Sequence, residues 1–198
     1  QTLRTRFRSQ HLPALSGASA AKGFLATGGE DVLQVDDEGE KVLRTTTSRF
    51  LKESEHNAFL HGRLDQQTVT LKDLSDPDRE KTTTSTFFHS LINDDNQQKT
   101  LLQVRETFKG HDLAERAVAR AVSIHTGLLH RAQDFNKVET HYHYDALNRL
   151  TVETIAPGTS HEAVRRYTYE LGAKPNQTVK DVNGVVSRTW FDGYNRAI

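Results

Sequence analysis

Polar and apolar residues alternate along much of the chain, which is the spacing of a β-strand with two different faces. The clearest early run is Leu3-Arg4-Thr5-Arg6-Phe7-Arg8. It predicts a strand that carries three arginines on one face. That face suits either an anion site or plain contact with solvent, and the balanced charge of the chain favours contact with solvent.

A threonine-rich segment occurs twice. Residues 44–50 read Arg-Thr-Thr-Thr-Ser-Arg-Phe, and residues 81–87 read Lys-Thr-Thr-Thr-Ser-Thr-Phe. Each copy follows an acidic turn, at residues 36–41 and 76–81 respectively. Threonine suits a pleated sheet because it is β-branched, whereas Asp, Gly and Pro favour turns. The pattern therefore predicts antiparallel hairpins that follow one another in a meander.

Residues 112–124 carry two conflicting signals. Asp112 is a suitable helix N-cap, and the alanines that follow it favour a helix. The same segment alternates through Val118 and Val122, which is typical of a strand. We expect a strand from Val118 onward, with at most one short helix near residues 112–119, because further strands follow directly.

Hairpin signals are dense in the last third of the chain. Tyr142 and Tyr144 fall on one face of a strand that leads into a turn at residues 145–149. A second turn, at Pro157-Gly158, precedes a further strand at residues 164–169. These intervals predict short antiparallel strands joined by tight turns.

Asn183-Gly184 gives the strongest single hairpin signal. Asn-Gly between β-rich segments is the preferred sequence of a type I′ two-residue turn, in which both residues need a positive φ. Pairing outward from this turn places Val182 opposite Val185 and Lys180 opposite Ser187. Neither face of the resulting hairpin is purely apolar. We therefore expect a sheet with solvent on both sides, like the wall of a hollow container.

Composition narrows the function classes. The 198 residues include 26 basic and 26 acidic side chains, and 35% of them are hydrophobic. The balance of charge gives no electrostatic reason to expect a nucleic-acid partner, and no apolar segment is long enough to span a membrane. The absence of cysteine excludes disulfides and thiolate chemistry. With no methionine, and ends at Gln1 and Ile198, we expect a piece of a longer polypeptide.

The candidate chemistry is sparse. His141 and His143 lie two residues apart on one strand face, a spacing that suits zinc or copper, with His125 and His130 nearby in sequence. No further ligand stands at a suitable spacing, so we interpret these histidines as residues of a solvated wall. No motif presents a serine nucleophile or a phosphate-binding loop. The sequence therefore predicts no catalytic residue, no metal site and no cofactor.

Two similar motifs carry a family resemblance. Residues 144–150 read Tyr-Asp-Ala-Leu-Asn-Arg-Leu, and residues 191–198 read Phe-Asp-Gly-Tyr-Asn-Arg-Ala-Ile. Both resemble the YD repeat of the RHS family, whose core is Tyr-Asp-x-x-Gly-Arg followed by Leu or Val. Asparagine replaces the glycine in both copies, and it is the best non-glycine residue for left-handed backbone. The resemblance is specific over residues 126–198 and weaker over the threonine repeats.

The motif also has a mechanical interpretation that needs no family. The aromatic residue packs on a neighbouring strand, and the aspartate accepts hydrogen bonds from backbone N–H groups that follow it. The asparagine takes the left-handed position, and the arginine reaches back to the aspartate. The residues with this expected role, together with those of the Asn-Gly turn, are Tyr144, Asp145, Asn148, Arg149, Asn183, Gly184, Phe191, Asp192, Asn195 and Arg196.

The resemblance implies an all-β fold of antiparallel hairpin repeats that form part of a spiralling shell. In large bacterial RHS toxins and the B-type components of insecticidal toxin complexes, such a shell encloses a C-terminal toxic domain until delivery. The implied partners are the rest of the shell, the enclosed toxin domain and other toxin-complex subunits, and the implied location is outside the producing bacterium. The self-cleavage motif of the family, Asp-Pro-x-Gly, is not matched, because Asp76-Pro77-Asp78-Arg79 lacks the glycine.

The alternative is a cell-surface adhesion module, since YD repeats also occur in such proteins. Exposed tyrosines such as Tyr142 and Tyr169 would then contact carbohydrate or protein. In either case we divide the chain into an unassigned segment at residues 1–30, degenerate threonine-rich hairpins at residues 31–125, and YD-type repeats at residues 126–198 that are truncated at the C-terminus.

Overall fold

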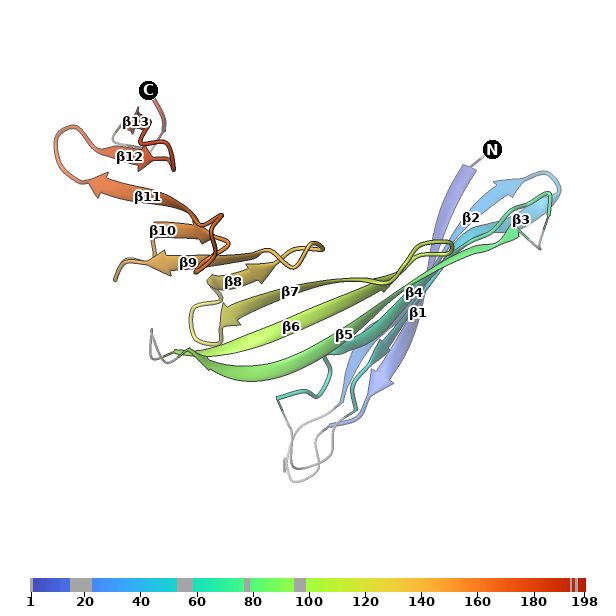
Figure 1. Cartoon of the computed structure of the whole chain (residues 1–198). Coiled ribbons are helices and arrows are strands. Elements are labelled where there is room, and N and C mark those ends of the chain that lie inside the picture. The colour runs from blue at the N-terminus through green and yellow to red at the C-terminus, as the bar shows by residue number, and fades with distance from the viewer. Residues whose placement is uncertain are drawn as a thin grey trace. The chain divides into compact units, whose positions relative to one another are not determined.

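The computed structural model describes residues 2–14, 23–52, 59–76, 79–94, 99–192, 194 and 196–198. Within these ranges the chain forms thirteen β-strands and no α-helix (Figure 1). The strands are β1 (Thr2–Leu12), β2 (Phe24–Asp36), β3 (Gly39–Phe50), β4 (Leu64–Leu71), β5 (Lys81–Asp94), β6 (Lys99–Lys109), β7 (Arg116–Ser123), β8 (Leu129–Gln133), β9 (Glu139–Tyr144), β10 (Leu150–Ile155), β11 (Ala163–Glu170), β12 (Asn176–Lys180) and β13 (Val186–Trp190).

The strands follow one another in the sheet in the same order as in the sequence. The expected all-β fold of antiparallel hairpins is confirmed. The strand expected from Val118 onward is present and begins at Arg116, and residues 112–115 contain no helix. In this segment, pairing with the neighbouring strand β8 outweighs the helix propensity of the alanines.

The chain divides into two compact units. The first comprises residues 1–89 and 105–117, and the second comprises residues 90–104 and 118–198. Strands β5, β6 and β7 each contribute residues to both units. In the described ranges, no helix is long and apolar enough to cross a membrane.

The first unit is held together by ion pairs across its strands. Arg4 and Arg6 of β1 both bind Glu40 of β3, the Arg6 contact being 2.6 Å, and Arg8 binds Asp31 of β2. The three arginines share one face, as expected. Because each of them already has a carboxylate partner on β2 or β3, their arrangement favours the interpretation as a strand face over an anion site.

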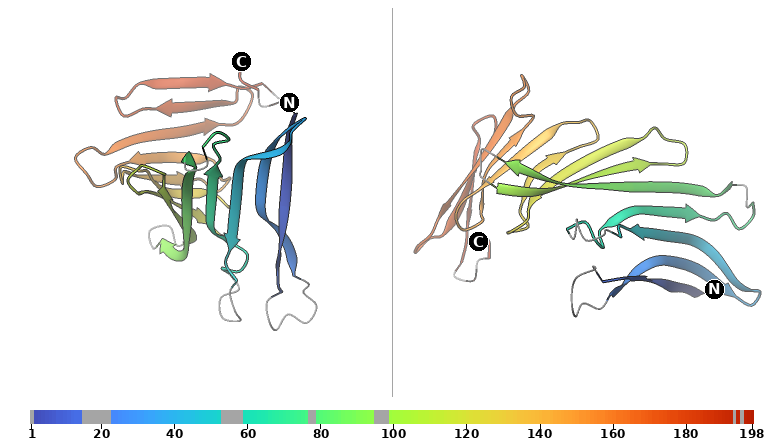
Figure 2. Two further views of the ribbon diagram at one scale, coloured as in Figure 1. Left: turned by 90° about the vertical axis from the view of Figure 1, so that its right-hand side faces the viewer. Right: turned by 90° about the horizontal axis from the view of Figure 1, so that it is seen from below.

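Threonine rows explain the repeated threonine-rich segment. The two copies lie in β3 and β5, and the unanticipated strand β4 lies between them. Opposite residues share a face, so threonines of the three strands line up as Thr45, Thr70 and Thr82 in one row and as Thr47, Thr68 and Thr84 in the next. The hydroxyls of Thr70 and Thr82 are 3.1 Å apart and form a hydrogen bond. Figure 2 shows β1 to β4 side by side in a single layer.

Little of the chain is buried. The buried hydrophobic residues of the described ranges are Leu12, Leu33, Leu101 and Ala121. Polar residues are buried as well, and in the second unit they include Asp94, which pairs with Arg131 at 3.1 Å. Most strand residues are only half-buried on both faces. Stability therefore depends on backbone ladders and on contacts at the strand ends more than on one large core.

Candidate functional site

A tight five-residue turn joins β9 to β10 at Asp145. The backbone N–H of Asp145 donates to the carbonyl of Arg149 at 2.9 Å, and the N–H of Asn148 donates to the carbonyl of Asp145 at 2.9 Å. Asn148 has a φ of 62°, so it occupies the left-handed position for which asparagine is suited. The turn lies where the sequence predicts it.

The Asp145 carboxylate holds this turn closed. Its Oδ1 accepts hydrogen bonds from the backbone N–H groups of Leu147 and Arg149, both at 2.9 Å. Its Oδ2 binds Nε of Arg149 at 2.8 Å and Nη2 at 2.7 Å. The backbone N–H of Arg149, followed by its guanidinium, lowers the pKa of Asp145 below the ordinary value. The carboxylate is therefore held in its charged form.

We call this five-residue arrangement an aspartate corner. The aspartate is at position 1, and its Oδ1 accepts hydrogen bonds from the backbone N–H groups of positions 3 and 5. The backbone N–H of the aspartate donates to the carbonyl of position 5. At Asp192 the same contacts recur, with the N–H groups of Tyr194 and Arg196 at 2.8 and 2.9 Å. Arg196 also binds Oδ2 through Nε and Nη2, both at 2.7 Å. The backbone N–H of Arg196 is the main cause that lowers the pKa of Asp192. Asn195, expected at the left-handed position, lies outside the described residues.

Two further aspartate corners were not predicted. At Asp134 the carboxylate accepts from Asn136 at 2.8 Å and Val138 at 2.9 Å, with the Asp134 N–H donating to the Val138 carbonyl. Lys137 takes the left-handed position, with a φ of 65°. This corner contains neither arginine nor glycine, so the sequence carries only a weak signal for it.

The corner at Asp181 corrects the expected type I′ turn. Asp181 accepts from the N–H groups of Asn183 at 2.9 Å and Val185 at 2.8 Å, and only Gly184 has a positive φ, 80°. The register is Lys180 opposite Val186, so the predicted pairing of Val182 with Val185 and of Lys180 with Ser187 is wrong. The carboxylate satisfies two backbone donors at once. It therefore favours a turn in which glycine alone adopts the left-handed conformation.

The four corners form a tandem repeat. Asp181 follows Asp134, and Asp192 follows Asp145, by 47 residues in both cases. The residues that match at this spacing are Asp134 and Asp181, Asn136 and Asn183, Val138 and Val185, Tyr144 and Phe191, Asp145 and Asp192, Asn148 and Asn195, and Arg149 and Arg196. Strand pairing obeys the same shift, since Leu150 lies opposite Tyr144 and Ala197 lies opposite Phe191. A search for Asp-x-Asn-x-Val followed by an aromatic-Asp pair would have found this repeat in the sequence.

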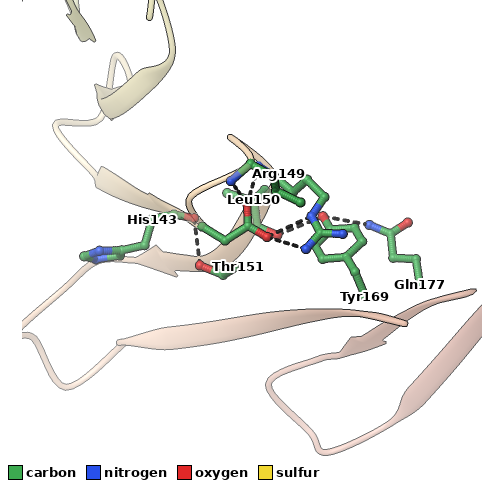
Figure 3. Close-up of polar contacts among 8 residues, drawn as sticks. His143, Arg149, Leu150, Thr151, Tyr169 and Gln177 are labelled. Atoms are coloured by element: carbon green, nitrogen blue, oxygen red, sulfur yellow. Dashed lines mark hydrogen bonds and ion pairs between the residues drawn. The ribbon is translucent and has the colours of Figure 1, made fainter. Parts of the chain in front are cut away.

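The Asp145 corner is tied to the next strands through Arg149. The guanidinium carbon of Arg149 lies 4.6 Å from the ring centre of Tyr169 in β11, a cation–π contact (Figure 3). The Tyr169 hydroxyl donates to the carbonyl of Leu150 at 2.8 Å and accepts from Nε2 of Gln177 at 3.2 Å. The Tyr169 side chain of β11 thus links the turn after β9 to β10, through Leu150, and to β12, through Gln177.

Tyr144 has the same role one hairpin earlier. Its hydroxyl donates to the carbonyl of Leu129 at 2.7 Å, as that of Tyr169 does to Leu150. Leu129 and Leu150 are the first residues of β8 and β10, so each tyrosine fastens the start of a strand. The Tyr144 ring also contacts the buried His130 edge-on, at 5.3 Å between ring centres. Burial, with a smaller effect of Tyr142, raises the pKa of the Tyr144 hydroxyl.

The histidines and tyrosines considered for binding have structural contacts. Nε2 of His141 lies 3.3 Å from Oε2 of Glu139, and no group of three or more His, Asp or Glu side chains among the described residues could hold a metal ion. Tyr169 is engaged through both its ring and its hydroxyl. Burial and the charge of Glu153 raise the pKa of Tyr142. Tyr194, by contrast, is 84% exposed.

No model of a known protein family matches the chain, and no match to a curated protein was found.

Proposed function

We propose that this chain is a structural segment of an RHS-type shell that encloses a C-terminal toxic domain until delivery. The observation that carries the proposal is the 47-residue repeat of aspartate corners, which gives the YD motif of residues 144–150 and 191–198 a mechanical role in closing hairpins. A wall of repeated hairpins can be extended without limit, because each repeat contacts mainly its neighbours.

The distribution of polar residues supports a wall. A sheet that covers a core on one face separates its apolar residues onto that face. Here the second unit has half-buried or exposed side chains on both faces, and few hydrophobic residues are buried in the described ranges. Such a sheet suits a partition with solvent or a hydrated cargo on either side.

The proposed role is mechanical and not enzymatic. Asp145 and Asp192 act by fixing backbone geometry, and Tyr144 and Tyr169 by fastening strand starts. The proposed partners are the remainder of the shell, its enclosed toxin domain and neighbouring subunits of a toxin complex. The assembled protein would act after secretion or translocation from a bacterium.

Corner variants in the complete toxin test the proposal. Asp145→Ala and Asp134→Ala should each open a corner, increase cleavage by an added protease and release cargo activity prematurely. His141→Gln with His143→Gln is the matched control, because neither imidazole has a ligand or proton-transfer role. The control should remain protease-resistant and retain full cargo activity on delivery.

Two results would reject the proposal. One is a histidine double variant that stays folded and protease-resistant but loses cargo activity, since that requires a chemical role for the imidazoles. The other is specific binding of the isolated chain to members of a glycan array that is abolished by Tyr194→Ala. That result would favour the adhesion alternative, because Tyr194 is the exposed tyrosine.

A further inference from the structure

Two cationic side chains face each other across β11 and β12. Arg166 and Lys180 are directly opposite in the strand register, so they lie on the same face of the sheet, and both are exposed. Like charges in this position destabilise a strand pair. Among the described residues, no carboxylate forms an ion pair with either of them. The sheet therefore contains an unfavourable contact that its own side chains do not offset.

The adjacent arginine is accommodated differently. Successive residues of a strand point to opposite faces, so Arg165 lies on the other face, where it is opposite Glu153 and binds it at 2.8 Å. In the first unit, Arg44 and Arg49 likewise bind a carboxylate of an adjacent strand, at 2.7 and 2.6 Å. Arg166 has a lysine at the place where Arg165 has its glutamate. This contrast makes Arg166 and Lys180 candidates for binding a carboxylate from outside the sheet.

The pair lies within the sheet and not at its edge. β11 is bordered by β10 and β12, and β12 is bordered by β11 and β13. The residues directly opposite the pair on the outer two of these strands are Val152 on β10 and Val186 on β13. Neighbouring strands are about 4.8 Å apart, so a further strand beside β13 would run about 10 Å from the backbone of Lys180. A carboxylate reaches the pair most directly from above the face.

The four aligned residues, Val152, Arg166, Lys180 and Val186, form what we call the Val-Arg-Lys-Val row. The row spans three strand spacings, about 14 Å, with a valine at each end. An extended polypeptide directs every second side chain to one side, so three such side chains span about 13 Å. A segment lying across the strands can therefore place an apolar side chain over each valine and a carboxylate between the two cations. Nucleic acids and sulfated glycans have no aliphatic side chains for the valines.

We propose that the Val-Arg-Lys-Val row binds an extended acidic segment of another polypeptide, in which an aspartate or glutamate has an apolar residue two positions before it and two positions after it. The carboxylate accepts hydrogen bonds from Arg166 and Lys180 and removes the repulsion between them. The apolar side chains cover the two valines. The inference rests on strand register and charge, and it holds whether or not the chain belongs to a toxin shell.

A peptide titration followed by NMR of the isotope-labelled chain tests the row. The probe is a capped heptapeptide with the sequence Thr-Val-Thr-Glu-Thr-Val-Thr. We expect saturable shifts of the backbone amide signals of the row, whereas the side-chain Nε–H signal of Arg165 on the other face should not move. Replacing the glutamate of the peptide by glutamine should weaken binding about five-fold, the effect of an exposed carboxylate that contacts two cations. Replacing both valines of the peptide by serine should weaken it as well.

The same substitution at two adjacent residues gives a matched pair of variants. Arg166→Glu replaces repulsion from Lys180 by attraction, so it should raise the melting temperature of the chain by about 2–4 °C while abolishing peptide binding. Arg165→Glu places two acidic residues opposite each other, because Glu153 faces it. It should lower the melting temperature and retain peptide binding.

Four results would overturn the proposal. They are equal binding of the glutamate and glutamine peptides, no saturable shift at the row, and a melting temperature that falls as far for Arg166→Glu as for Arg165→Glu. The fourth is tighter binding of a heparin oligosaccharide or single-stranded DNA than of the peptide, which would assign the row to sulfate or phosphate groups. The peptide comparisons use the wild-type chain, so they hold even if a variant fails to fold.

Discussion

The two units of the chain maintain strand register in different ways. In the first unit the strands are long, and pairs such as Arg8 with Asp31 and Arg44 with Glu30 hold them along their length. In the second unit, β8 to β13 are five to eight residues long, and all of them except β11 have an aspartate corner at one end or at both. A long ladder fixes its register by many weak contacts, whereas a short strand depends on its turn.

A finer contrast exists among the corners themselves. Those at Asp145 and Asp192 carry an arginine at position 5 that binds Oδ2 of the aspartate. Those at Asp134 and Asp181 have valine at that position. The backbone hydrogen bonds are the same in all four. The arginine is therefore an addition to a corner that the aspartate and the backbone already form.

Removal of a corner aspartate should have the largest effect. Asp145→Ala deprives two backbone N–H groups of their acceptor and leaves Arg149 without its carboxylate. We expect the melting temperature of the chain to fall by about 5 °C, measured by circular dichroism. Asp31→Ala in the first unit is the comparison and should cost less, because the remaining ladder still holds its strands. A larger loss for Asp31→Ala would contradict the contrast between the units.

The effect of Asp145→Ala should also depend on pH. The pKa of Asp145 is lower in the folded chain than its ordinary value of about 3.9, so its contribution to stability is fully present above that value. The contribution is lost as the pH falls through the folded-state pKa. Melting temperatures of the wild type and Asp145→Ala should therefore differ at neutral pH and converge in acid. A constant difference down to pH values near 2 would disprove the role of the charged carboxylate.

A side chain at the left-handed position of the Asp181 corner should have the second largest effect. Gly184→Val places a β-branched residue at a φ of 80° and should cost about 1–2 kcal/mol in the free energy of unfolding. The added Cβ meets only the Lys180 side chain, at 3.9 Å, so the cost arises from the backbone and not from crowding. Gly184→Asn is the matched control and should cost less. Chemical denaturation of both variants measures the difference.

Loss of a tyrosine hydroxyl should have a smaller effect. Tyr144→Phe removes the hydrogen bond to the Leu129 carbonyl and should cost about 1 kcal/mol. One repeat later, the residue equivalent to Tyr144 is Phe191, which has no hydroxyl. Phe191→Tyr is therefore the reciprocal variant, and we expect it to be neutral or slightly stabilising. If Tyr144→Phe has no measurable effect on unfolding by denaturant, the hydroxyl does not fasten β8.

Addition of an arginine should have the smallest effect. Val185→Arg gives the Asp181 corner the guanidinium that the Asp145 and Asp192 corners have. We expect a gain of about 0.5 kcal/mol, the usual value of an exposed pair, which decreases at high salt. Val185→Lys is the control, since it adds charge without the two-pronged contact. An equal gain from lysine would show that general charge, and not the corner geometry, is responsible.

The sequence predicted the corners only where several residues agree. At Asp145 the tyrosine, aspartate, asparagine and arginine all favour one turn, and the turn is present. At Asp181 the pair Asn183-Gly184 is a strong signal for a different turn, and that signal takes no account of the aspartate two residues before Asn183. At Asp134 the left-handed residue is Lys137, whose intrinsic preference is for other conformations. Side-chain acceptors outweighed local propensity at both sites.

Tertiary pairing explains the other differences. The strand β4 was not anticipated, although its threonines lie directly between those of the two predicted copies. Residues 112–119 have helix-forming alanines, but the backbone of β7 pairs with β8 instead. The partners of Arg4 and Arg6 could not be predicted either, because Glu40 lies two strands away and the register that brings them together is not local.

The consecutive order of the strands has a mechanical consequence. In the described sheet, every strand borders only those that precede and follow it in the sequence. A pulling force on the two ends would therefore peel the ladders open rung by rung, because no strand must slide out from between two others. In an optical trap the extension of such a chain would increase in a series of small steps, one for each released strand. The extension would pause at the corners. A polypeptide that unzips in this way can be drawn end first through a narrow pore without an abrupt global rupture.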